Sequence, residues 1–92
     1  MERDARRLVR DRERLFELSR GGSAGRPIEV QSSSVIEPRI RSTPCPQCEG
    51  TLGVVDHQAT SATARKVQVR CAMCGVPRAL YFVIVPPVFA DN

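Results

Sequence analysis

The four cysteines of this 92-residue chain constrain its fold more than any other feature, because they form two Cys-X-X-Cys pairs. The pairs are Cys45 with Cys48 and Cys71 with Cys74, and 22 residues separate them. Two residues between cysteines allow a tight turn to direct both sulfurs at one ion, while the backbone N–H groups of the turn point back at the thiolates. We therefore expect all four sulfurs to bind a single metal ion.

The residues between the two pairs are predicted to form a hairpin. Residues 51–56 and 65–70 have strand-like patterns, and a small polar loop over residues 58–64 joins them. A strand of about six residues spans roughly 20 Å, so the hairpin runs out and returns to its starting point. A third strand over residues 78–85 is apolar on both faces, which predicts cover on each side. Both cysteine pairs should then lie at the same end of a three-stranded antiparallel sheet.

The size of the chain favours a metal that stabilises the fold. A domain of this length buries only about 60 to 65% of its unfolded surface, so a hydrophobic core alone is marginal. A structural zinc ion contributes on the order of 10 to 16 kcal/mol in small peptide hosts. Four sulfur ligands also close the zinc tetrahedron and leave no position for water or substrate. We therefore expect one structural Zn²⁺ and no enzymatic activity.

The cysteine pairs, the hairpin and the third strand together resemble a zinc ribbon, over residues 45–85. One position departs from the family pattern: Glu49 follows Cys48 where the family prefers glycine, whereas Gly75, after Cys74, conforms to it. The resemblance implies a structural zinc site. It is less specific for function, because zinc ribbons occur in transcription factors, ribosomal proteins, enzyme insertions and many small bacterial proteins without an assigned role.

An amphipathic helix is predicted at the N-terminus, over residues 2–19. Its apolar side chains recur at spacings of three and four residues and share one face: Ala5, Leu8, Val9, Leu15 and Phe16. The pair Gly21-Gly22 is expected to end this helix.

The whole chain is predicted to be a small α+β protein in three parts. These parts are an N-terminal helix at residues 1–20, a flexible linker at 21–27 and a zinc-ribbon domain at 28–92 with its core at 45–85. Residues 27–44 are expected to be extended, and the chain from residue 86 onward irregular.

Two other uses of the cysteines stay open, namely iron in a rubredoxin-like site and redox-active thiols or disulfides. A rubredoxin-like iron site is packed by aromatic side chains, whereas this chain has no Trp, one Tyr and three Phe. This composition argues against iron. No signal-like apolar run follows the N-terminus, and no stretch approaches the ~20 apolar residues of a membrane span. We therefore expect a cytoplasmic protein, and in a reducing compartment paired cysteines favour metal binding over structural disulfides.

The charge pattern leaves two kinds of partner open. The formal net charge of +4 falls to +2 once four thiolates and one divalent ion are counted. We expect the apolar helix face or the third strand to contact a protein partner or a second copy of the chain. Nucleic acid is the alternative, through a set of strand residues: Arg65, Lys66, Arg70, Arg78 and Tyr81. Carboxylates on the polar face of the helix argue against a membrane surface.

The single histidine, His57, is expected in a solvated turn beside Asp56. The other interpretation makes it a general base or an alternative metal ligand. Four cysteines already complete a ligand set, so we expect no catalytic role for His57. Arg70 and Arg78 are candidates to offset the negative charge of the thiolate site.

Overall fold

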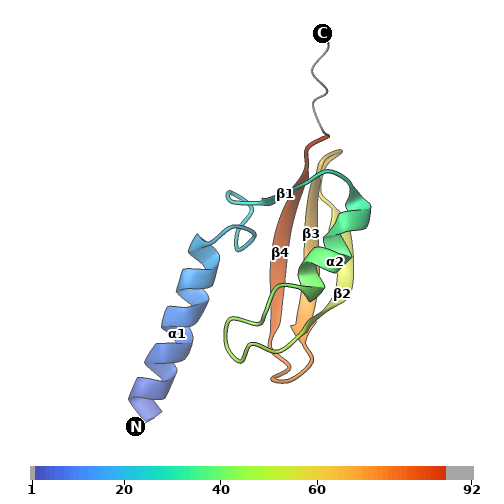
Figure 1. The fold of residues 1–92 in the computed structure, drawn as a ribbon. Helices are drawn as coiled ribbons and strands as arrows, with labels where there is room; N and C mark the ends of the chain where they lie inside the picture. The colour runs from blue at the N-terminus through green and yellow to red at the C-terminus, as the bar shows by residue number, and fades with distance from the viewer. Residues whose placement is uncertain (1, 87–92) are drawn as a thin grey trace.

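The computed structural model describes residues 2–86 of the chain, and the predicted irregular tail after Pro86 lies outside them. Its elements, in chain order, are α1 (Glu2–Leu18), β1 (Ile28–Val30), η1 (Ser33–Val35), α2 (Ile36–Arg41), β2 (Leu52–Ala59), β3 (Ala64–Cys71) and β4 (Pro77–Ile84) (Figure 1). This arrangement confirms a small α+β protein with an N-terminal amphipathic helix.

The sheet has four strands in the order β1-β4-β3-β2. Strands β2, β3 and β4 pair antiparallel, as predicted, and Leu52 lies opposite Cys71 in the register of the hairpin. Strand β1 adds to the free edge of β4 in parallel, with Ile28 opposite Phe82 and Val30 opposite Ile84. The expectation of a three-stranded antiparallel sheet is therefore correct for the hairpin and third strand but wrong about β1. The alternation of Ile28 and Val30 indicates a strand without indicating its partner.

The prediction that residues 27–44 are extended is wrong for residues 33–41, which are helical. The reason lies in Ile36 and Ile40, which are four residues apart and so share one face of α2, where each is 1% exposed. Pro38 does not oppose this helix, because it lies in the first turn, where the N–H that proline lacks has no intrahelical partner. Short helices with one buried pair are easily mistaken for extended chain.

Helix α2 lies over one face of the sheet and covers the core (Figure 1). Alternate residues of each strand point into this core, as the two-residue period of a strand requires. The sheet side chains in it are Ile28, Val30, Leu52, Val67, Val69, Leu80 and Phe82. On the opposite face of β4, Tyr81 and Val83 are only half-buried. The third strand is thus covered on one face and partly open on the other.

The β2–β3 hairpin is longer than predicted. Strand β2 continues to Ala59 and β3 begins at Ala64, so the expected loop over residues 58–64 shrinks to four residues. Strand β2 is the outer strand of the sheet, and nearly all of it is exposed. Polar residues can therefore continue its pairing without any cost of burial, which explains why composition placed the loop too early.

Helix α1 lies beside β4, along the part of the β4 edge that β1 does not pair (Figure 1). Phe16 packs against the core, while Leu8, Leu15 and Leu18 stay at least half exposed. After the helix, the Gly21 carbonyl accepts a hydrogen bond of 2.9 Å from the Tyr81 N–H of β4. No helix within residues 2–86 has the length and apolar character needed to cross a bilayer. The division of the chain at residues 21–27 stays a prediction.

Candidate metal centre

The four cysteine sulfurs converge at one end of the sheet, all within 4.8 Å of one another. Cys45 Sγ and Cys74 Sγ are 3.8 Å apart, and Cys48 Sγ and Cys71 Sγ are 3.3 Å apart. Zinc–sulfur bonds of about 2.3 Å in a tetrahedron place the sulfurs roughly 3.8 Å from one another. All four cysteines are free thiols. The donor set and its spacing therefore fit one tetrahedral metal ion, and these are the four residues that the sequence singled out.

Two turns of the same design carry these sulfurs, and we call them the first cysteine turn (residues 45–50) and the second cysteine turn (residues 71–76). In the first, the Glu49 N–H donates to the Cys45 carbonyl at 2.8 Å. In the second, the Gly75 N–H donates to the Cys71 carbonyl at 3.0 Å. Glu49 and Gly75 occupy the same place in each turn and have positive φ angles of 63° and 74°. The departure from the family pattern thus falls where the backbone is left-handed, which favours glycine.

The two turns are packed directly against each other. The Ala72 N–H donates to the Thr51 carbonyl at 2.9 Å, so the second turn is anchored to the start of the hairpin. Gly50 lies at the closest approach, where an added Cβ would be 2.9 Å from Cys71 Sγ and 3.0 Å from Met73 Cβ. A side chain at position 50 would therefore separate the two half-sites.

The environment of the sulfurs is asymmetric. Cys45 and Cys71 are buried in the core, Cys48 is half-buried and Cys74 is exposed. The buried pair ties the metal site to the hydrophobic core, whereas Cys74 faces solvent. The exposed sulfur and the three less exposed ones together offer four ligand atoms to one ion.

The thiols of the site differ in pKa. The Cys74 and Met73 N–H groups each donate to Cys71 Sγ at 3.4 Å, and they lower the pKa of Cys71 to about 6. The Gly50 N–H acts in the same direction on Cys48, but the neighbouring sulfurs, Cys71 first among them, raise the pKa of Cys48 to about 12. Metal binding has to displace whatever protons remain on the four thiols, because only thiolates ligate the ion.

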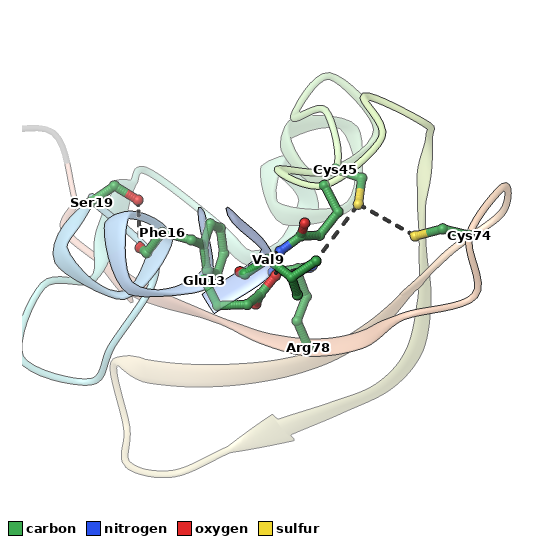
Figure 2. Close-up of polar contacts among 8 residues, drawn as sticks. Val9, Glu13, Phe16, Ser19, Cys45, Cys74 and Arg78 are labelled. Atoms are coloured by element: carbon green, nitrogen blue, oxygen red, sulfur yellow. Dashed lines mark hydrogen bonds and ion pairs between the residues drawn. The ribbon is translucent and has the colours of Figure 1, made fainter. Parts of the chain in front are cut away.

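Arg78 supplies a buried positive charge beside the site. Its side chain is 3% exposed, and its guanidinium donates to Glu13 Oε1 at 2.7 Å and to Glu13 Oε2 at 3.0 Å. The same group lies 3.9 Å from Cys45 Sγ and 5.0 Å from the centre of the Phe16 ring (Figure 2). Burial by itself lowers the pKa of Arg78, but the hydrogen bond and charge of Glu13, and then Cys45, raise it above its usual value. Arg78 thus lies beside the sulfurs, as expected, but its charge is paired with the Glu13 carboxylate, so its role as a counter-charge to the thiolates stays a prediction.

The other residues named from the sequence lie away from the sulfurs. His57 lies in β2, exposed and opposite Val67, rather than in the turn where we placed it. Lys66 pairs with Tyr81 across β3 and β4, so these two candidates do share a face. The remaining two basic candidates are Arg70, which is exposed, and Arg65, which bonds the carbonyls of the hairpin tip.

Two residues of the site escaped the sequence analysis, Glu13 in α1 and Gln47 in the first cysteine turn. Gln47 donates to the Val9 carbonyl at 3.0 Å and also bonds the Glu13 carboxylate. These partners are more than 30 residues apart in the chain, and no local motif marks them. The only signal in the sequence was that the carboxylate of Glu13 lies next to the apolar face of the helix. A carboxylate there favours a basic partner, and Arg78 is that partner in the structure.

Comparison of the chain with protein-family models, with curated proteins and with solved structures finds no significant match. The four-cysteine arrangement is consistent with a zinc-ribbon-like site on its geometry alone.

Proposed function

We propose that this protein is a non-catalytic zinc-binding module, in which Cys45, Cys48, Cys71 and Cys74 hold one structural Zn²⁺ and the module acts through contacts with another protein. The observation that carries the metal assignment is the convergence of four sulfurs within 4.8 Å. Soft thiolate ligands in a tetrahedral set favour zinc or iron over the hard cations. A closed set of four leaves the ion a structural role.

Elemental analysis of protein purified without added metal tests this assignment. We expect one zinc per chain and no iron. A red protein with stoichiometric iron would overturn zinc in favour of a rubredoxin-like centre. A metal-free protein that keeps its native amide spectrum in strong chelator would overturn the metal site altogether.

The protein-contact part of the proposal is supported by the uncovered face of α1. Three leucines of this helix are at least half exposed, the largest value being 68% for Leu15. Exposed apolar side chains in a row on one helix favour burial against another surface. The test uses the natural chain and a Leu8→Ser/Leu15→Ser variant. Sedimentation velocity measures the oligomeric state of each, and a pull-down measures which proteins each one binds. This part would be contradicted if the natural chain were strictly monomeric and bound no protein that the variant fails to bind.

Nucleic acid is the second candidate, and a different face of α1 favours it. Arg7, Arg10 and Arg14 recur at spacings of three and four residues, so they lie on one side of the helix. All three are exposed, and within residues 2–86 none of them forms an ion pair. Arginine side chains in such a row can neutralise successive phosphates.

Oligonucleotide binding measured against salt concentration tests the second candidate. Replacing Arg7, Arg10 and Arg14 with glutamine should weaken binding and flatten its salt dependence, since fewer counterions are then released. The matched change Lys66→Gln/Arg70→Gln tests the sheet face instead. Absence of any binding at low ionic strength would remove nucleic acid as a partner.

A further inference from the structure

Three hydrogen bonds join α1 to the first cysteine turn, and all of them meet at Gln47. Arg12 donates to the Gln47 carbonyl at 3.0 Å, the Gln47 amide donates to the Val9 carbonyl at 3.0 Å, and the same amide bonds Glu13. Gln47 lies between the two ligands of this turn, immediately before Cys48. The helix therefore holds the turn at its centre.

A second link runs through the sheet, from Glu13 to Arg78 and on to Cys45. Figure 2 shows Glu13 and Arg78 meeting between α1 and β4, with the guanidinium close to the Cys45 sulfur. Arg78 Nε is buried and has no hydrogen-bond partner within the described part of the chain, so the Glu13 carboxylate is the main group that satisfies this side chain. The Glu13 carboxylate thus contacts both Gln47 in the turn and Arg78, which lies beside the ligand Cys45.

We propose that α1 is a clamp on the first cysteine turn: the docked helix holds Cys45 and Cys48 ready for the metal, so that helix docking and metal binding stabilise each other. The inference rests on the zinc site proposed above and adds that residues outside the ligand set determine its affinity. The positioning residues are Arg12, Glu13, Gln47 and Arg78.

The direction of the coupling follows from conformational entropy. A turn that is free in solution loses backbone freedom when it closes on an ion, whereas a turn already held by a helix loses less. By linkage, an ordered turn presents Gln47 to the helix in the bonded geometry and so favours docking by the same factor. Docking is sensitive to this because α1 buries little apolar surface, with Phe16 the main contact to the core.

The second cysteine turn offers an internal contrast. No hydrogen bond or ion pair within residues 2–86 joins it to α1, and Met73, between its two ligands, is 75% exposed. The clamp therefore acts on one half-site only.

Zinc affinity of the full-length chain, measured by competition with a chromophoric chelator, tests the proposal. Gln47→Ala removes two bonds to α1 without any change of charge, and Arg12→Ala removes the third. Removing a residue that supports a metal ligand typically lowers metal affinity by about 10- to 100-fold. We expect about a 10-fold loss for Gln47→Ala and a smaller loss for Arg12→Ala. The matched controls, Gln58→Ala and Arg14→Ala, remove the same side-chain types from positions without contacts to the turn, and should bind zinc as the natural chain does.

Amide hydrogen exchange of α1 in the zinc-loaded variants gives the second readout. Gln47→Ala and Arg12→Ala should increase exchange in α1, and the two controls should not. Unchanged zinc affinity in Gln47→Ala and Arg12→Ala would overturn the clamp while leaving the zinc site in place. Weakened affinity with unchanged α1 exchange would also overturn it, because the loss would then arise within the turn. A natural chain that takes up no zinc would instead refute the proposed function.

Discussion

The two cysteine turns have the same backbone design but differ in what supports them. In the first, Glu49 occupies the left-handed position, and α1 contacts the turn through Gln47. In the second, Gly75 occupies that position, and the turn lies open, with Met73 and Cys74 both exposed. The comparison shows that one local geometry can be reached by a favourable residue or by a less favourable one with outside contacts. Both turns contact the start of the hairpin or each other, but only the first is also contacted by α1, and only the second has glycine at the left-handed position.

The largest effect should follow from removing a buried ligand of either turn. Cys71→Ser is expected to abolish zinc binding at neutral pH and to leave residues 45–85 largely unfolded, since the metal supplies on the order of 10 kcal/mol or more. Cys45→Ser should do the same, because both sulfurs are buried in the core. Zinc titration and the amide NMR spectrum measure the two losses. A Cys71→Ser protein that retains the native amide spectrum would contradict the assignment.

A smaller loss is expected from separating the two turns. Gly50→Ala places a methyl group 2.9 Å from Cys71 Sγ and 3.0 Å from Met73 Cβ. Neither neighbour can move easily, because one is a ligand and the other is attached to the backbone, so we expect a loss of about 1 to 3 kcal/mol.

The matched control for this change is Gly53→Ala in β2, where the nearest atom to an added Cβ is the Arg70 carbonyl oxygen at 3.9 Å. This contact is ordinary, and the stability of Gly53→Ala should stay within about 0.5 kcal/mol of the natural chain. Denaturant unfolding at one fixed excess of zinc compares the two variants, since free metal shifts apparent stability. Equal effects at the two positions would show that the turns are not tightly packed.

The smallest effects should come from the left-handed positions, and they should have opposite signs. Glu49→Gly relieves a side chain at φ 63° and is expected to stabilise the zinc-loaded protein by about 1 kcal/mol, whereas Gly75→Ala introduces one at φ 74° and should destabilise it by about 1 kcal/mol. The variant Glu49→Ala separates backbone strain from charge, because it removes the carboxylate and keeps the strain. If Glu49→Ala stabilises as much as Glu49→Gly, the benefit comes from charge, and the comparison of the turns loses its conformational basis.

The parts of this molecule that the sequence predicts are those set by local pattern. Strand-like patterns predicted β2 and β3, an apolar run predicted β4, and the helical period predicted α1. The spacing of the cysteines predicted that Cys45, Cys48, Cys71 and Cys74 lie together. Each of these signals lies within a few residues of the chain or in a simple hairpin return.

The parts that escaped prediction depend on contacts between distant residues. Helix α2 is stabilised because Ile36 and Ile40 pack against the sheet in the core. A helix of six residues without such packing is too short to be stable. The contact of Glu13 with Arg78 joins residues 65 positions apart. Their opposite charges allow Glu13 and Arg78 to pair, but nothing in the sequence indicates that Glu13 pairs with Arg78 and not with another arginine.

The parallel pairing of β1 with β4 also determines the order in which the chain can assemble. Ile28 and Val30 precede their partners Phe82 and Ile84 by most of the length of the chain. At about 5 to 20 residues per second of synthesis, β1 waits roughly 3 to 10 s on the ribosome before β4 has been made. Strand β1 has no partner strand during that interval, whereas the β2–β3 hairpin joins residues close together in the chain and so can form first.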